Sequence, residues 1–364
     1  MRITAFTRYG SDAASTRQRL LQYLPALATG GIEVECHPLL DDRHVRALAN
    51  GRRSSRWEIA KAYLRRLEGL AGWAQGADLI WVYAELFPYL PAGFETRVFA
   101  SGKPVIYDFD DAFFLKYELS PNPLVRASLG RKLEPLLTGA AACLCGNDYL
   151  QTYAAQFCSN SVYLPTVVDT ATYLPAPVAR NDTEIVVGWI GSPSTWRYVV
   201  PALPVLRQLA VTHGIRVRII GAGPAARTEA FARMDLIEWT RASEVADIQA
   251  MDVGIMPVID EPWALGKCGY KLIQYMGCGL PVVASPVGVA TRIIDHGVNG
   301  FLATSPAEWA AALTGLIENV ALRRAMGQAG RAIVERDYSL ATHAPRLTQV
   351  LKAAAAAADA LAPR

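Results

Sequence analysis

The sequence predicts an α/β protein with two doubly wound domains, each built on a parallel sheet. The chain has 364 residues, more than one hydrophobic core usually serves. In both halves, short apolar runs alternate with helix-length segments, which is typical of parallel strands joined by crossover helices. A polar stretch with several prolines separates the two series of runs.

The strands are expected at the apolar runs. In the first half these are 2–6, 33–37, 79–82, 105–107, 141–144 and 161–164. In the second half they are 185–189, 216–220, 235–238, 253–256, 281–284 and 300–302. The predicted domains are 1–168 and 183–338, with a linker at 169–182 and a terminal helical segment at 339–364 that is expected to fray from Ala356. Ligands of open parallel sheets bind at the carboxyl ends of the strands, so we expect the function in a cleft between the two sheets.

Composition excludes several classes of protein. Hydrophobic residues make up 52% and charged residues 19% of the chain, so it can bury a large core and is not disordered. The formal net charge of +3 gives no global attraction to nucleic acid. The first residues lack the apolar run of a secretory signal, and no membrane-spanning helix is expected. The six cysteines have no zinc-ligand spacing, so we expect reduced thiols in a cytoplasmic protein.

The stretch 43–66 is strongly basic, with eight cations against a single acid, Glu58. Trp57, Tyr63 and Leu64 lie among the cations, as on an amphipathic helix at an anionic lipid surface. The alternative is a solvated helix face.

The most informative segment is 266–285. Apolar residues at helical spacing predict a helix that starts near Gly269 and ends at Gly277 to Gly279. Lys271 lies in its first turn, where a cation is unfavourable unless an anion compensates. Together with Lys267 and the amides of Gly269 and Tyr270, it predicts a diphosphate site. The alternative is two solvated lysines on a surface helix.

Small-residue turns after three other strands are weaker candidates for ligand contacts. Gly191 and Ser192 permit close backbone approach before a helix expected near Tyr198, and Arg197 can reach a phosphate. The other turns contain Gly221 and Gly223 in the second domain, and Gly10, Ser11, Arg17 and Arg19 in the first. Each is also compatible with ordinary turn chemistry.

Three carboxylates follow the strand at 105–107. Asp108, Asp110 and Asp111 repel one another unless they bind a cation, hydroxyls or an arginine. Without another obvious metal ligand, we expect hydroxyl binding or pairing with Arg17 or Arg19, and we predict no metal site. Asp111 is a candidate cap for the next helix. The structural alternative is a cap plus a salt bridge.

Over essentially its full length, the chain resembles glycosyltransferase family 4, whose members have the GT-B fold. The resemblance is carried by 252–257 followed by 271–285, and supported by 297–302, Gly330-Arg331 and Tyr338-Ser339. It implies a retaining transfer from a nucleotide-diphosphate sugar, UDP-, GDP- or dTDP-linked, without a required metal or other cofactor. It also implies an acceptor-binding first domain, a nucleotide-sugar-binding second domain, and a last helix that crosses back onto the first domain.

The sequence departs from this family at the donor loops. The family's two glutamates correspond to Gly266 and Gln274, although Glu261 lies where the first is expected when counted from Pro257. Gln274 can still bond a ribose hydroxyl. Ser192 stands where the family has an arginine, and Arg197 lies at or beside its lysine. A subset with a Gly-Lys-Cys loop is similar in these features.

The resulting hypothesis assigns catalysis to Asp108, Asp110, Asp111, Arg197 and Lys271. The donor-binding set also includes Gly10, Ser11, Arg17, Gly191, Ser192, Gly221, Gly223, Glu261, Lys267, Gly269, Tyr270 and Gln274. The partners expected are a nucleotide sugar and a glycan or lipid-linked acceptor of surface polysaccharide or glycoconjugate synthesis, with anionic membrane contact through 43–66. The alternatives are a catalytically silent subunit and a nucleotide-sugar epimerase.

Overall fold

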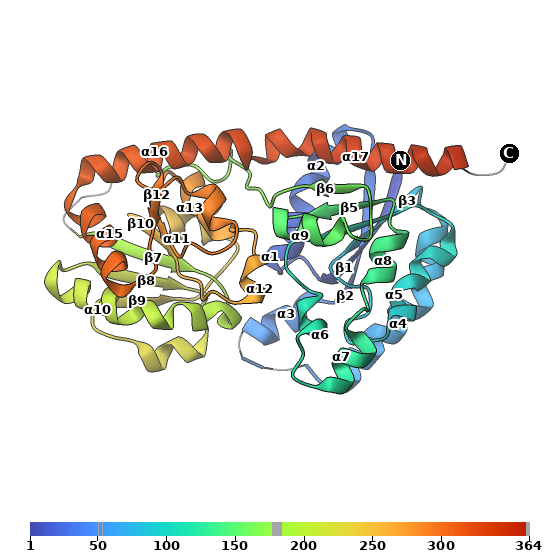
Figure 1. The fold of residues 1–364 in the computed structure, drawn as a ribbon, viewed down its shortest axis with the longest axis horizontal. Coiled ribbons are helices and arrows are strands. Elements are labelled where there is room, and N and C mark those ends of the chain that lie inside the picture. The colour runs from blue at the N-terminus through green and yellow to red at the C-terminus, as the bar shows by residue number, and fades with distance from the viewer. Residues whose placement is uncertain (50, 53, 177–183, 362–364) are drawn as a thin grey trace.

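The computed structural model describes residues 1–49, 51–52, 54–176 and 184–361. They form two six-stranded sheets in which every strand pair is parallel (Figure 1). The predicted α/β class with two doubly wound sheets is therefore confirmed.

The first sheet has the order β2-β1-β3-β4-β5-β6. Its strands are β1 (Arg2–Tyr9), β2 (Glu33–Leu40), β3 (Leu79–Tyr83), β4 (Val105–Phe109), β5 (Ala142–Cys145) and β6 (Ser161–Tyr163). Strands β3, β4 and β5 are buried throughout, which is why they appear in the sequence as continuous apolar runs.

The second sheet has the order β12-β11-β10-β7-β8-β9. Its strands are β7 (Val186–Ile190), β8 (Arg216–Ile220), β9 (Met234–Ile237), β10 (Val253–Met256), β11 (Val282–Ala284) and β12 (Gly300–Leu302). The chain order reverses between β7 and β10, so the loops that follow these two strands diverge at a topological switch point. Open parallel sheets place their ligands at such a point.

Helices connect the strands and cover both sheets (Figure 1). Those of the first domain are α1 (Ala14–Arg19), α2 (Leu24–Thr29), α3 (Asp42–Ala49), α4 (Arg56–Gln75), α5 (Ala92–Glu95), α6 (Leu115–Glu118), α7 (Pro123–Leu129), α8 (Glu134–Gly139) and α9 (Asp148–Ala154). Those that follow are α10 (Leu203–Thr212), α11 (Glu244–Gln249), α12 (Pro262–Leu265), α13 (Tyr270–Gly277), α14 (Ala290–Ile293), α15 (Pro306–Glu318), α16 (Val320–Asp337) and α17 (Leu340–Leu361). Short 3₁₀ helices are η1 (Leu21–Tyr23), η2 (Thr96–Ser101), η3 (Pro193–Tyr198), η4 (Val200–Ala202) and η5 (Pro224–Glu229).

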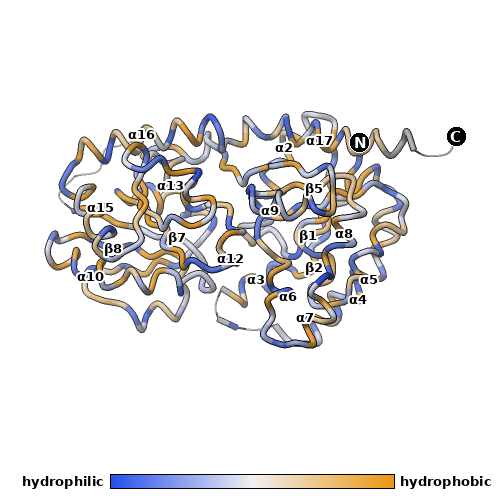
Figure 2. Tube along the Cα trace, viewed as in Figure 1, coloured by the Kyte–Doolittle hydropathy of each residue, from blue (hydrophilic) through white to orange (hydrophobic). Residues whose placement is uncertain are grey.

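The last two helices join the domains. In Figure 1, α16 runs along the second domain and α17 continues over the first. Leu347, Leu351 and Ala354 of α17 are buried in one cluster with Ile3 and Trp81 of the first sheet. Figure 2 shows hydrophilic and hydrophobic stretches along both helices, consistent with one buried and one solvated face. The predicted crossing of the last helix onto the first domain is confirmed.

Three local predictions are corrected. The helix expected near Tyr198 begins only at Leu203, after two 3₁₀ helices, because Pro201 and Pro204 lack the N–H groups of a continuous helix. Asp111 caps no helix, since α6 begins at Leu115 with Phe114 at its N-cap. The alanine-rich end of α17, expected to fray from Ala356, is helical to Leu361.

Two further predictions concern segments that the structure describes only in part. The linker predicted at 169–182 is described as far as 176, and its other residues lie outside the described part. In the basic stretch 43–66, Arg66 is buried and donates to the carbonyls of Leu86, Thr7 and His37, so it is not part of an exposed cationic face. No helix among the described residues combines the length and the hydropathy needed to cross a membrane.

Candidate functional site

The turn that enters α13 has free backbone donors. Gly269 is the N-cap residue, with φ +67, and no side chain caps the helix. Such a positive φ favours glycine, which explains its place at this tight turn. Among the described residues, the amides of Gly269, Tyr270 and Lys271 have no hydrogen-bond acceptor. The turn predicted to be an anion site is therefore not closed by internal hydrogen bonds.

Two lysines flank this turn. Lys271 Nζ lies 5.7 Å from the ring centroid of Trp189, and Lys267 Nζ lies 5.4 Å from that of Tyr198. Within the described ranges neither ammonium forms an ion pair. Burial and the charge of Lys267 lower the pKa of Lys271 to about 8, although Asp111 acts in the opposite direction. A bound anion would stabilise both cations.

Arg197 and Glu261 contact each other, on the loops that follow β7 and β10. They form an ion pair, and Arg197 Nη2 also donates to the Tyr198 hydroxyl at 2.8 Å. That hydroxyl donates to Glu261 Oε1 at 2.5 Å. Glu261 therefore lies beside the loop that follows β7, where it partly neutralises the charge of Arg197.

The glycine turns of the second domain lie close together. A Cβ on Gly191 would collide with the Trp189 ring, and one on Gly221 would collide with the carbonyl oxygen of Gly191. Gly221 and Gly223 have φ values of +75 and +74, which side chains rarely adopt. Ser192 is the N-cap residue of η3, and its backbone N–H donates to the hydroxyl oxygen of Thr195. These glycines allow the ends of β7 and β8 to approach each other closely.

The Gly10-Ser11 loop packs onto its own domain. Ser11 Oγ donates to Asp42 Oδ2 at 2.9 Å, and a Cβ on Gly10 would collide with the Asp42 carboxylate. Arg17 reaches across the domain interface instead: its Nη2 lies 3.6 Å from Glu244 Oε2, and its guanidinium lies 4.8 Å from the Trp239 ring centroid. Arg17 is therefore the member of this loop that contacts the second domain.

Asp108 belongs to the core of the first domain. Its side chain is fully buried; Oδ1 accepts from Arg19 Nε (3.1 Å) and Nη2 (2.5 Å), and Oδ2 accepts from Trp81 Nε1 (3.2 Å). The predicted pairing with Arg19 is confirmed. Protein donors thus bind both oxygens of this buried carboxylate, which favours a structural role for Asp108 over the predicted catalytic one.

Asp110 and Asp111 lie at the domain interface. Asp110 accepts from the Tyr83 hydroxyl at 2.6 Å, and its carbonyl is 3.1 Å from Cys268 Sγ of the second domain. Burial raises the pKa of Asp111 to about 6, against the opposing charge of Lys267. Two of the three predicted carboxylates therefore share an electrostatic environment with Lys267.

Gln274 lies in a buried polar cluster that the sequence did not predict. Its Nε2 donates to the Tyr173 hydroxyl (3.1 Å) and to Glu244 Oε1 (3.2 Å). Glu244 also accepts from Trp239 Nε1 at 2.6 Å. A carboxylate thus stands beside the position where the family resemblance expects a glutamate. The sequence signal for Glu244 was only an acid in the first turn of a helix, which is ordinarily explained by the helix dipole.

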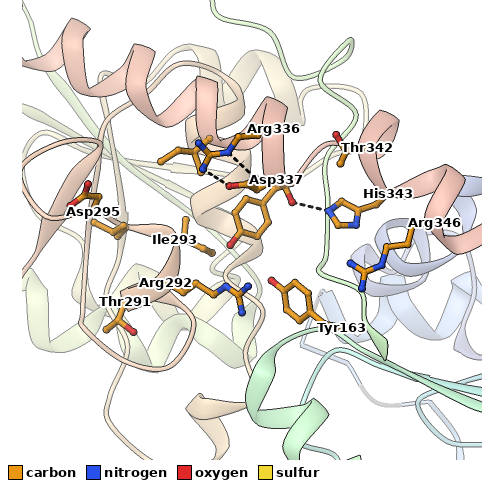
Figure 3. Close-up of a pocket in the computed structure, with 13 residues that line it drawn as sticks. Tyr163, Thr291, Arg292, Ile293, Asp295, Arg336, Asp337, Thr342, His343 and Arg346 are labelled. Atoms are coloured by element: carbon orange, nitrogen blue, oxygen red, sulfur yellow. Dashed lines mark hydrogen bonds and ion pairs between the residues drawn. The ribbon is translucent and has the colours of Figure 1, made fainter. Parts of the chain in front are cut away.

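A cavity of about 670 Å³ lies elsewhere, at the joint between α16 and α17 (Figure 3). Arg292 lies over the Tyr163 ring there, at 4.6 Å from its centroid, and the His343 ring is 2.8 Å from the carbonyl oxygen of Asp337. None of the residues predicted to bind donor lines this cavity. Among the described residues, no group of three or more His, Cys, Asp or Glu side chains is placed to hold a metal ion.

Comparison with known proteins finds a family model that matches part of the second domain. Residues 184–319 match the family model described as Glycosyl transferases group 1. A D-inositol 3-phosphate glycosyltransferase of Pseudarthrobacter chlorophenolicus is 31% identical over 188 residues, which cover 45% of this chain and 44% of that protein. The chain thus aligns with less than half the length of this curated relative.

Solved structures match the chain over nearly its whole length. The Anabaena protein Alr3699/HepE in complex with UDP and glucose matches with a TM-score of 0.70 at 18% identity, covering 97% of this chain and 100% of that one. The sucrose-phosphate synthase of Thermosynechococcus elongatus gives 0.75 at 16% identity, covering 98% and 99%. The chain has the GT-B fold. Its second domain carries the group 1 glycosyltransferase match, which includes the α13 turn and the loops after β7 and β10.

Proposed function

We propose that this GT-B protein is a retaining glycosyltransferase. It moves a sugar from a nucleotide-diphosphate sugar to a hydroxyl of a glycan or lipid-linked acceptor, in surface polysaccharide or glycoconjugate synthesis. The observation that carries the proposal is the α13 turn: within the described part of the chain, three of its backbone amides have no acceptor and the two flanking lysines have no ion-pair partner. Such a group of donors favours a diphosphate.

In this proposal the donor lies on the second domain. Its diphosphate accepts hydrogen bonds from the amides of Gly269 to Lys271, and Lys267 and Lys271 neutralise its charge. The ribose and base are proposed to lie toward the turn of Gly221 and Gly223 after β8 and toward Gln274 of α13. A relative in fold binds UDP-glucose, which makes a UDP-sugar the first donor to test, before GDP- and dTDP-sugars.

The chemistry requires charge stabilisation more than a side-chain base. The bond between the anomeric carbon and the phosphate oxygen breaks, and its electron pair remains on the diphosphate. The acceptor oxygen bonds to the same face of the anomeric carbon, and its proton passes to the leaving phosphate. Lys271, Lys267 and Arg197 stabilise the developing negative charge. Arg197 also forms an ion pair with Glu261.

The first domain is proposed to hold the acceptor. Asp110 and Asp111 lie at the domain interface in the field of Lys267, where carboxylates can accept hydrogen bonds from sugar hydroxyls. Asp108, bound by Arg19 and Trp81, belongs to the core of the same domain. Gly10 and Ser11 lie on the loop that Arg17 links to Glu244 of the second domain.

The test is turnover with a panel of UDP-, GDP- and dTDP-sugars, with and without candidate acceptors. We expect nucleotide diphosphate release that depends on the acceptor, and a product whose anomeric configuration, read by proton NMR, matches the donor. Donor binding without turnover would favour the silent subunit, and conversion of donor without an acceptor would favour the epimerase.

We further propose a cytoplasmic protein that contacts the inner face of the membrane through 43–66. Arg52, Arg56 and Lys61 are exposed there, beside Trp57 (78% exposed) and Leu64 (55% exposed). Sedimentation with anionic vesicles at low salt should carry the protein into the pellet, and neutral vesicles should not. If the protein stayed in the supernatant with both kinds of vesicle, the proposed membrane contact would be refuted.

A further inference from the structure

The start of α9 in the first domain is hydrogen-bonded to residues 265–268 of the second domain, which we call the lysine loop. Asn147 is the N-cap residue of α9, and its Oδ1 accepts from the Leu150 amide at 2.8 Å. Its Nδ2 donates to two carbonyl oxygens of the other domain, those of Leu265 (2.9 Å) and Lys267 (3.1 Å). The side chain is only 2% exposed. Both ends of this amide are therefore in use, one within its own domain and one across the interface.

The backbones around this contact lie close together. A Cβ on Gly146 would collide with Cys268 Sγ, and one on Gly266 would collide with the backbone of Ala112. Cys268 itself lies 3.1 Å from the Asp110 carbonyl oxygen. Glycine on each side of the interface thus permits the lysine loop, residues 265–268, to lie against the first domain.

A second contact lies one residue further along α9. Asp148 forms an ion pair with Arg292 of α14, whose guanidinium lies over Tyr163 (Figure 3). This pair is half exposed, so its contribution is small. The buried amide of Asn147 is the stronger and more specific link, because its loss would leave two carbonyl oxygens without their donor.

We propose that Asn147 is a positioning residue that holds the lysine loop in place from the opposite domain. The loop carries Lys267 and leads directly into the Gly269 turn, so the diphosphate site is complete only when α9 is docked against it. Domain docking and donor binding then stabilise each other, as reciprocal linkage requires. This inference rests on the proposed function for its effect on the donor, but the docking of the loop stands on the contacts alone.

The test uses substitutions that keep the helix cap. Asn147→Asp retains a cap acceptor at the α9 N-terminus but cannot donate to the carbonyls of Leu265 and Lys267. Asn147→Ser also caps but is too short to reach them, and it introduces no charge beside Lys267. Asn122→Asp is the matched control, because Asn122 caps α7 through the Leu124 amide and, among the described residues, forms no hydrogen bond with the second domain.

Two measurements separate the docking of the lysine loop from its effect on donor binding. The first is alkylation of Cys268 by a maleimide, followed by mass spectrometry of its peptide; this thiol is 9% exposed when the loop is docked. Both Asn147 variants should label roughly tenfold faster than wild type, and the control should not. The second is the dissociation constant for UDP by titration calorimetry, which should rise roughly tenfold, as for the loss of one hydrogen bond.

Unchanged labelling of Cys268 in both folded variants would overturn the docking role, whatever UDP does. Faster labelling with unchanged UDP affinity would overturn the effect on the donor. If wild type bound no nucleoside diphosphate at all, the proposed function would fail, while the labelling result would still decide the docking.

Discussion

The two domains present opposite kinds of polar site at the ends of their central strands. At the end of β4, Asp108 is buried and both its oxygens are bound by Arg19 and Trp81. After β10, the amides of Gly269 to Lys271 have no acceptor among the described residues. In the first site, protein donors already bind the carboxylate. In the second site, the amides can still donate hydrogen bonds to a bound ligand. A cluster of charged residues alone therefore does not indicate a ligand site. Backbone N–H groups without an acceptor are the better indicator.

The largest effect is expected from breaking the satisfied site. Asp108→Ala leaves the buried guanidinium of Arg19 without its carboxylate, which should lower the free energy of unfolding by about 3 to 5 kcal/mol. Urea denaturation would measure it. Exposed Glu68 on α4 gives the control, Glu68→Ala, with an effect below about 1 kcal/mol. Equal stability of the two variants would contradict the structural role of Asp108.

The unsatisfied site should respond in affinity and not in stability. Lys271→Met removes one charge next to the proposed diphosphate and should weaken UDP binding by about 1.5 to 3 kcal/mol, the cost of losing a charge-assisted contact. Its unfolding free energy should be unchanged or higher, because burial opposes the charge of Lys271. Calorimetry with UDP measures the first and urea denaturation the second. Unaltered affinity would refute the assignment of Lys271.

A smaller effect follows from pH. Since the pKa of Lys271 is lowered to about 8 by burial and by Lys267, the lysine loses its proton above that pH and a bound diphosphate must restore it. UDP affinity should fall above pH 8, approaching about tenfold per pH unit. Stability should change in the opposite sense: the unfolded chain keeps this proton up to its ordinary pKa, about 10.4, so the folded state gains stability as pH rises through this interval.

The control for this prediction is Lys271→Met, in which the pH dependence of UDP affinity should be largely absent. Calorimetry between about pH 7 and about pH 9.5 covers the interval. An identical slope in wild type and variant would assign the titration to another group.

Most of the fold could be predicted from the sequence. Central parallel strands are covered on both faces, so each appears as an uninterrupted apolar run. Every predicted strand is present, and its ends lie within three residues of the expected ones. The Gly269 turn could be predicted for a local reason as well: a glycine before a helical pattern fixes where the helix begins. Both are properties of short segments, which sequence patterns record.

The contacts between the domains could not be predicted in this way. Asn147 looks like an ordinary helix cap, and nothing near it in the sequence indicates that its amide reaches Leu265 and Lys267 more than a hundred residues away. Glu244 is similar, since its role depends on Gln274 and Arg17. Asp108 was assigned to the ligand for the reverse reason: the sequence shows the charge but not the burial.

The central claim is that the entry to α13 binds the diphosphate of a donor. A crystal structure of the complex with UDP tests it most directly. The claim predicts β-phosphate oxygens within about 3.2 Å of the amide nitrogens of Tyr270 or Lys271, with the Lys271 ammonium turned toward them. Phosphates bound at another place, for example at the arginines around the α16–α17 joint, with the α13 amides bonded to water, would contradict it.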